Sequence, residues 1–159
     1  MKVKKTAPRK TWQEKLLDNK GFPKVSPIDS AKSKRWGTGT FVIPAPLEVD
    51  ALMREVPKRR LITIDEIRRR LATKHGATIG CPLTTGIFAW IAAHAAAERE
   101  AAGKRRITPY WRTLKTKGEL NPKYPDGIAG LTRRLTAEGH LVIQRGKRFF
   151  VEDYERRLV

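Results

Sequence analysis

Apolar residues of this chain recur at helical spacing in several places. Val49, Leu52, Met53 and Val56 stand at positions i, i+3, i+4 and i+7, and Pro57 follows them directly. This spacing predicts an amphipathic helix that ends before the proline, because proline lacks the backbone N–H that a helix interior needs. Just before it, residues 40–43 have the apolar and β-branched character of a short strand.

Two further helix starts are marked by capping residues. Residues 63–66 read Thr-Ile-Asp-Glu, a capping box in which the threonine hydroxyl and the glutamate satisfy free backbone N–H groups. The helix that it begins has a buried face of Ile64, Ile67 and Leu71. Pro82 then begins a longer helix over about residues 83–102, since proline is favoured in the first turn.

The last part of the chain predicts one helix and one hairpin. Asp126 is placed to cap a helix that ends at Gly139 and buries Ile128, Leu131 and Leu135. Residues 141–144 and 147–151 flank an Arg-Gly pair and predict a β-hairpin. The order helix, turn, helix, basic hairpin is typical of a winged helix-turn-helix, so we expect an α+β domain of that kind over residues 41–159.

The first 40 residues differ from the remainder in composition. They hold 11 Lys or Arg and 3 Asp or Glu, a net charge of +8, and Gly21, Pro23 and Pro27 interrupt regular structure. Only residues 12–17 show a helical pattern. We expect residues 1–40 to be a basic N-terminal arm that is partly ordered by docking or by binding. A disordered solubilising tail is the alternative that composition leaves open.

Charge is the strongest bulk property of the chain. The 34 Lys and Arg against 16 Asp and Glu give a net charge of +18 and a sequence pI of about 10.6. Such a protein attracts polyanions, of which nucleic acid is the commonest in a cell. One cysteine and three scattered histidines predict no intrachain disulfide, metal site or cofactor. No apolar run approaches the roughly 18 residues of a membrane span. We therefore expect a cytoplasmic monomer without membrane contact, associated with the nucleoid if the source is bacterial.

Four short motifs carry a resemblance to a known family. They are Thr108-Pro109-Tyr110-Trp111-Arg112, Lys117-Gly118-Glu119-Leu120, Pro125-Asp126-Gly127 and Glu138-Gly139-His140. Their order and spacing resemble the C-terminal DNA-binding domain of the alkylguanine-DNA alkyltransferases, over about residues 43–140. The resemblance implies that the helix beginning at Pro82 enters the minor groove of DNA.

The resemblance also implies that the family's chemistry is lost. Tyr110 and Trp111 stand where the family has the cysteine that accepts the alkyl group and its histidine partner, whereas Arg112 and Glu138 match the family's arginine and glutamate. A phenol with an ordinary pKa of about 10 is a poor substitute for a thiol. The chain is most similar to the cysteine-less alkyltransferase-like proteins, which bind damaged DNA and recruit other repair proteins. It departs from them because no Lys or Arg lies between Lys74 and Arg99, so the family's base-flipping arginine is absent.

These observations predict a non-enzymatic DNA-repair protein that binds duplex DNA through phosphates. Small residues predict a smooth helix face for the groove, although the same residues also suit close packing between helices. Basic residues flanking that helix predict a phosphate-binding rim. We expect a vestigial base pocket at Tyr110, Trp111 and Glu138, and we expect no catalytic residue. The predicted DNA contacts are Thr84, Thr85, Gly86, Ala89, Lys104, Arg105, Arg106, Arg112, Lys115 and Lys117.

Two alternative functions remain open at the level of sequence. The first is a group-transfer enzyme of the methyltransferase family that uses Cys81 as the acceptor, because a cysteine just before a helix start occupies a position that favours a reactive thiolate. The second is an RNA-binding or ribosome-associated basic protein, since phosphate contacts do not by themselves distinguish RNA from DNA.

Overall fold

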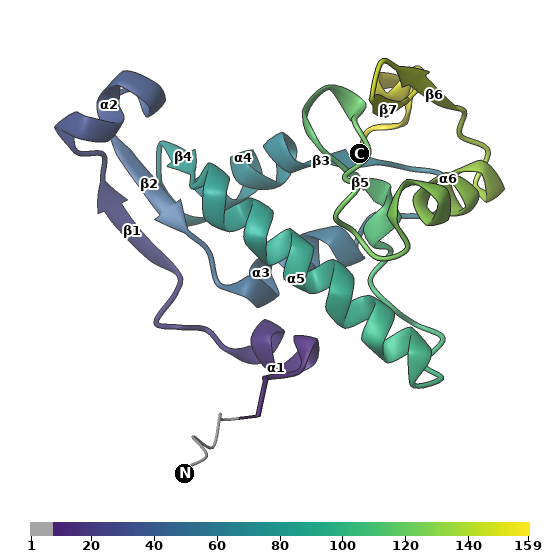
Figure 1. Cartoon of the computed structure of the whole chain (residues 1–159). Coiled ribbons are helices and arrows are strands. Elements are labelled where there is room, and N and C mark those ends of the chain that lie inside the picture. Colours follow the sequence, from purple (N-terminus) through teal and green to yellow (C-terminus); the bar gives the residue numbers. More distant parts are fainter. Residues whose placement is uncertain (1–7) are drawn as a thin grey trace, which may run out of the picture.

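The computed structural model of the chain describes residues 8–159 as a mixed α and β structure. Its central element is the 20-residue helix α5, which runs through the middle of the molecule and is contacted by α1, α3 and α4 (Figure 1). The helices are α1 (Trp12–Leu17), α2 (Ser30–Trp36), α3 (Pro46–Arg54), α4 (Ile64–His75), α5 (Pro82–Ala101) and α6 (Gly127–Ala137). Three short 3-10 turns are η1 (Tyr110–Arg112), η2 (Thr116–Gly118) and η3 (Tyr154–Arg157).

The strands form three small sheets. They are β1 (Lys24–Pro27), β2 (Thr40–Ile43), β3 (Ile62–Thr63), β4 (Ile79–Gly80), β5 (Thr113–Leu114), β6 (Val142–Arg145) and β7 (Arg148–Val151). One sheet has the order β1-β2-β4, with β1 and β2 antiparallel and β2 and β4 parallel. Strands β3 and β5 pair in parallel, and β6 and β7 form the antiparallel hairpin. The α+β class predicted from the sequence is therefore confirmed.

The threonine of the predicted capping box caps α4, whereas the Glu66 carboxylate binds Arg69 and Arg70 and makes no capping hydrogen bond. The Thr63 hydroxyl accepts a hydrogen bond from the Glu66 backbone N–H at 3.3 Å at the start of α4, and Gly76 ends that helix with a φ of 64°. Helix α3 begins at Pro46, and its residues Val49 and Met53 are fully buried. The strand predicted at residues 40–43 is also confirmed, as β2.

Helix α5 turns its small residues toward the interior. Ala89, Ala92 and Ala93 have no exposed surface, and Phe88 and Ile91 are buried with them. Helices α1, α3 and α4 all pack against α5, and small side chains let helix backbones approach closely. The core of the protein therefore surrounds this helix, and only one narrow face of it reaches the solvent.

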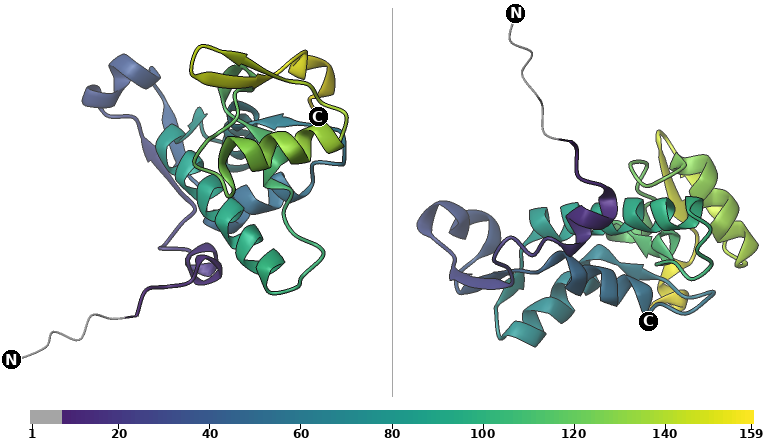
Figure 2. Two further views of the ribbon diagram at one scale, coloured as in Figure 1. Left: turned by 45° about the vertical axis from the view of Figure 1, so that its right-hand side comes forward. Right: turned by 90° about the horizontal axis from the view of Figure 1, so that it is seen from below.

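The N-terminal segment is attached to the body at two places. Helix α1 matches the helix predicted at residues 12–17 and lies beside α5 (right-hand view of Figure 2). The Trp12 ring stacks on His94, with 4.5 Å between ring centroids, and the Glu98 carboxylate accepts the Trp12 backbone N–H at 3.1 Å. Strand β1 pairs with β2, so the predicted boundary at residue 40 falls inside one sheet. Residues 1–7 of the predicted arm lie outside the described residues.

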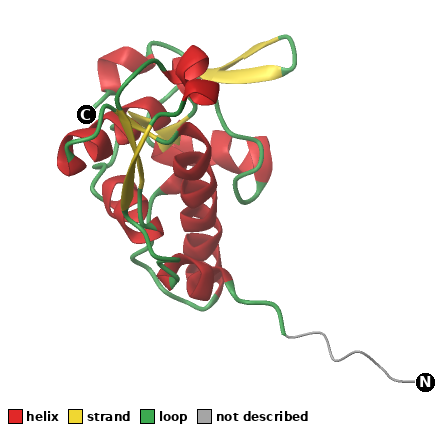
Figure 3. Ribbon diagram, turned by 90° about the vertical axis from the view of Figure 1, so that its left-hand side faces the viewer, coloured by secondary structure: helices red, strands yellow, loops and turns green. Residues whose placement is uncertain are grey.

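In the C-terminal part of the chain, the predicted hairpin is confirmed and one predicted helix cap is wrong. Strands β6 and β7 meet at Gly146-Lys147, and the hairpin extends from the body of the molecule (Figure 3). Asp126 precedes α6 with a φ of 63°, and its side chain makes no capping hydrogen bond, so the predicted side-chain cap is wrong. The backbone of this residue is left-handed, whereas an N-cap residue that accepts from the first turn is normally extended. No described helix is long and apolar enough to cross a membrane.

Candidate nucleic-acid interface

Tyr110 is enclosed at the centre of the segment that carries the family resemblance. Its side chain is 1% exposed, and its ring meets the rings of Trp111 and Tyr124 edge to face, at 5.3 Å and 6.2 Å between centroids. Burial raises the pKa of the Tyr110 phenol, although the Arg134 guanidinium acts in the opposite direction. The phenol is therefore neutral and packed, which suits a structural ring and not a nucleophile.

Glu138, at the end of α6, is fully engaged by hydrogen bonds from this segment. Its carboxylate accepts Trp111 Nε1–H at 3.1 Å, Arg112 Nε–H at 3.0 Å and Arg112 Nη2–H at 2.6 Å. Burial alone would raise the pKa of Glu138, but the bonds from Arg112 and Trp111 hold it below its ordinary value. The carboxylate is therefore ionised, and its hydrogen bonds hold the residues of η1.

The three residues of the predicted vestigial pocket do come together, but they fill the space that a pocket would need. None of five well-formed cavities among residues 8–159 is lined by Tyr110, Trp111 or Glu138. The Arg134 guanidinium lies 4.5 Å from the Trp111 ring centroid and covers the cluster further. The candidate interface therefore lies elsewhere on the surface.

Arg112 is also unavailable for the phosphate contact predicted for it. Its side chain is only 13% exposed, and besides Glu138 it donates from Nη1 to the Val56 carbonyl oxygen at 2.8 Å. A guanidinium whose donors are used inside the protein would have to leave a buried ion pair in order to meet DNA. The predicted phosphate contact of Arg112 is therefore wrong, because Glu138 at the end of α6 binds its guanidinium.

Two more predicted DNA contacts are wrong, because they lie on the buried, small-residue face of α5. Thr85 and Ala89 are completely buried, and the Thr85 hydroxyl donates to the Cys81 carbonyl oxygen at 2.6 Å. The Thr84 hydroxyl oxygen is also shielded, and it has no hydrogen-bond partner among residues 8–159. Of the predicted contacts on this helix, only Gly86 lies on a surface cavity. The alternative interpretation, packing between helices, holds for Thr85 and Ala89.

The exposed face of α5 carries large apolar residues that were not predicted from the sequence. Leu83 is 69% exposed and Ile87 is 41% exposed. They are four residues apart and so lie on one side of the helix, and Trp90 continues that side. Helical spacing could have identified them, because they stand opposite the small residues. The sequence does not show which side of α5 the neighbouring helices cover.

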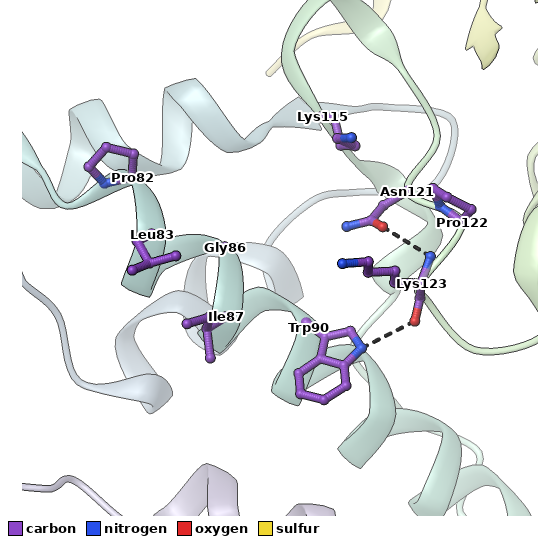
Figure 4. A pocket seen from close by; sticks show the side chains of 9 residues that line it. All are labelled: Pro82, Leu83, Gly86, Ile87, Trp90, Lys115, Asn121, Pro122 and Lys123. Carbon is purple, nitrogen blue, oxygen red and sulfur yellow. Dashed lines mark hydrogen bonds between the residues drawn. The ribbon is translucent and has the colours of Figure 1, made fainter. Parts of the chain in front are cut away.

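A cavity of about 540 Å³ lies between this face and the loop that follows β5 (Figure 4). Trp90 holds the loop in place, since its Nε1–H donates to the Lys123 carbonyl oxygen at 3.2 Å. The Asn121 side chain also accepts the Lys123 backbone N–H, at 3.0 Å. No acidic residue lines this cavity. Its lining is Pro82, Leu83, Gly86, Ile87, Trp90, Lys115, Asn121, Pro122 and Lys123.

Basic residues of the loop and of the hairpin lie on the same side of the protein. The Leu120 backbone N–H donates to the Phe149 carbonyl oxygen at 2.8 Å, which joins the loop to β7. Lys117 of the loop and Arg145 of the hairpin line one smaller cavity. The same cavity is also lined by the acids Glu152, Asp153 and Glu155. A further acid, Glu119, has its carboxylate 3.8 Å from the Lys115 ammonium and 3.9 Å from the Arg148 guanidinium. We call this set the loop–hairpin cations; it consists of Lys115, Lys117, Lys123, Arg145 and Arg148.

The cations predicted to form one phosphate-binding rim are separated along the length of α5. Lys104, Arg105 and Arg106 are exposed, but they directly follow the C-terminal end of the helix (Figure 1). A helix of 20 residues spans about 30 Å, so these three lie far from Leu83. Lys115 lines the cavity beside the first half of the helix, whereas Lys117 lines the cavity beside the hairpin. The structure thus separates the predicted rim into two groups.

Cys81 lies inside the protein at the start of α5. Its side chain is 5% exposed, and its backbone N–H donates to the Val42 carbonyl oxygen at 2.9 Å. The histidine nearest to it in sequence, His75, contacts Glu48 instead, with 2.6 Å between His75 Nε2 and the carboxylate. Within residues 8–159 no group of three potential metal ligands is found. The surroundings of Cys81 therefore offer neither solvent access nor a visible activating base.

Comparison with known proteins gives one structural neighbour. No family model matches the chain, and a search of the curated proteins finds no match. The neighbour is Atl1 of S. pombe, an alkyltransferase-like protein, in its crystal structure in complex with damaged DNA containing O6-carboxymethylguanine. The likeness covers 72% of this chain and 93% of that chain, with 19% sequence identity and a TM-score of 0.49. A likeness of this degree assigns no role to any residue of this chain.

Proposed function

We propose that this chain is a non-enzymatic, alkyltransferase-like protein that binds duplex DNA. It presents the first half of α5 to the DNA, with the loop–hairpin cations on the phosphates beside it. Helices α4 and α5 act as the helix-turn-helix and the β6–β7 hairpin as its wing. The observation that carries the proposal is an uncharged helix face bordered by Lys115 and Lys123 in a cavity without acids.

Electrostatics support a nucleic acid as the partner. Lys117 and Lys123 are exposed and make no ion pair within 4 Å in the described part of the chain. Cations that are not neutralised by the protein's own carboxylates are free to displace counterions from phosphates, which is the main source of sequence-independent affinity for DNA. The net charge of +18 adds long-range attraction.

The cluster around Tyr110 supports binding without chemistry. Its phenol is buried and neutral, and its neighbours Trp111 and Arg112 are occupied by Glu138. A displacement reaction needs an accessible nucleophile and a base that can take its proton. Recruitment of other repair proteins, a monomeric state and a cytoplasmic location stay predictions.

The proposal is tested by the salt dependence of binding to a 20-base-pair duplex. We expect log Kd to change linearly with log salt. A K115A/K117A/K123A variant should reduce the slope by about 0.9 for each phosphate that is no longer neutralised, up to about 2.7 in total. The matched control is K104A/R105A/R106A, which removes the same charge at the far end of α5 and should reduce the slope less. An affinity that does not vary with salt would contradict the proposal.

A competition binding assay distinguishes duplex DNA from RNA as the partner. Unlabelled duplex DNA should displace the labelled duplex at lower concentration than an RNA duplex of the same sequence at physiological salt. If the RNA duplex competes better, the protein is an RNA-binding protein and the alternative replaces the proposal. An equal decrease of slope in the two triple variants would show that binding is not localised beside the first half of α5.

A further inference from the structure

The exposed strip on the first two turns of α5 needs an explanation. It consists of Leu83, Gly86 and Ile87, and Leu83 has the largest exposed fraction of any large apolar residue in the described chain. Isolated exposed apolar residues are common, but here two of them lie side by side at the mouth of an apolar cavity (Figure 4). Two adjacent exposed apolar side chains beside a cavity with a polar rim form a candidate interaction surface.

Gly86 is an independent sign of close approach. It lies inside the helix with ordinary helical backbone, where glycine is less favourable than alanine. A Cβ added at this position would meet nothing within 4 Å, so no packing inside the protein requires the missing side chain. Bare backbone between Leu83 and Ile87 lets the surface of a partner come close to the helix.

Charge narrows the choice of partner. A second copy of this chain would bring another +18 toward the strip, and like charges repel. The cavity beside the strip is lined by Lys115, which lies 3.8 Å from Glu119, and by Lys123, which has no ion pair in the described chain. Its lining contains no acid, so it favours a partner that carries negative charge at its edges and apolar groups between them. Duplex DNA meets this description, because phosphates flank a groove whose floor is formed by sugars and base edges.

The direction of the Leu83 side chain suits insertion. Side chains on a helix lean toward its N-terminus, so a residue in the first turn extends ahead of the helix body. Leu83 follows the proline that begins α5, and its side chain is free of internal partners over most of its surface. An apolar side chain placed in this way can enter between base pairs and unstack them, which kinks the duplex.

We propose that Leu83 is an apolar wedge that inserts between two base pairs, that Ile87 packs behind it, and that Gly86 admits the sugar edge of the groove. This inference rests on the proposed function and deepens it by naming the class of substrate. The preferred duplexes are those that unstack at low cost, such as a mismatched pair or a TA step. The protein should bind a more deformable duplex more tightly, because less free energy is needed to unstack its base pairs.

The test uses a 20-base-pair duplex with 2-aminopurine beside a central mismatch, since the fluorescence of this base increases when it is unstacked. The full-length protein should increase the fluorescence at saturation and bind the mismatched duplex about tenfold more tightly than the matched one. L83A should lose most of both effects. The matched control is L47A, because Leu47 is also an exposed leucine that directly follows the first proline of a helix, in α3.

A second variant tests Gly86. G86A should raise the melting temperature of the free protein, because alanine is the better helix former, and yet weaken binding to the mismatched duplex several-fold. A residue with a merely structural role would not lower affinity while raising stability. If G86A binds as tightly as the unaltered protein, close approach to the helix is excluded and the inference fails.

The remaining outcomes separate this inference from the function on which it rests. Salt-dependent binding without any increase in fluorescence, or equal behaviour of L83A and L47A, would overturn the wedge and leave duplex binding intact. Absence of binding to any duplex would overturn both. Sedimentation of the protein without DNA supplies the last outcome: a dimer that L83A dissociates would show that the strip covers a second copy instead.

Discussion

The Glu138 carboxylate should be a structural requirement of the fold and not the remainder of a catalytic relay. We predict that E138A destabilises the protein strongly. Its carboxylate is 6% exposed and the Arg112 side chain 13% exposed, so the substitution leaves a nearly buried guanidinium without its counterion. Removing one partner of a buried pair costs about 3–5 kcal/mol. We expect about 3 kcal/mol, at the lower end of that range, because Arg112 keeps its bond to the Val56 carbonyl oxygen.

Urea unfolding followed by tryptophan fluorescence measures this loss directly. Trp111 donates to Glu138 and so reports on the same cluster. For a domain of this size a loss of about 3 kcal/mol corresponds to a decrease in melting temperature of roughly 6–12 °C. The matched control is E55A. Glu55 is also the glutamate that ends a helix, α3, but it is exposed, and we expect less than about 0.5 kcal/mol from its removal.

A double-mutant cycle shows whether the loss belongs to the pair. If Arg112 and Glu138 stabilise the fold together, the double variant R112A/E138A should be less destabilised than the sum of the single variants, by about 1–3 kcal/mol. Additive losses would contradict the reasoning, as would an E138A variant no less stable than E55A. Duplex affinity of the folded E138A fraction should stay within about twofold of the unaltered protein, since Glu138 lines no cavity described on the DNA side.

Three further predictions follow from buried groups. The A89L variant should have a free energy of unfolding about 1–3 kcal/mol lower in urea, because the larger side chain overpacks the core around α5. Unaltered stability together with weak DNA binding would instead show that Ala89 faces the DNA. Burial lowers the pKa of His140, although the Glu138 charge opposes this, so the unfolded chain binds a proton at a higher pH than the folded protein does. Stability should therefore fall as the pH decreases from about 7 through the ordinary value of 6.5, and H140Q should flatten this slope; an unchanged slope would exclude His140 as its source. Finally, the intact mass of the protein should not change after incubation with O6-alkylguanine DNA, and an added alkyl group on Cys81 would establish the enzymatic alternative.

Local signals in the sequence determined most of the helix positions. The Thr63 N-cap and the prolines at residues 57 and 82 act through backbone groups only a few residues away. Their effect is therefore the same in any tertiary setting, and the helices begin and end close to the predicted residues. Asp126 is the exception, because its backbone is left-handed and its side chain makes no capping hydrogen bond.

The tertiary structure alone decided which residues are available to a partner. Arg112 and Glu138 are 26 residues apart, and no local pattern shows that one consumes the donors of the other. The two faces of α5 present the same difficulty: small residues such as Ala89 suit close contact with a groove or with another helix, and the sequence does not distinguish the two. In the folded chain Ala89 and Ala93 are completely buried in the core around α5, because close packing excludes water there at the lowest cost. Leu83 stays exposed because α1, the helix that packs on the same side of α5, contacts Trp90 and His94, further toward the C-terminal end.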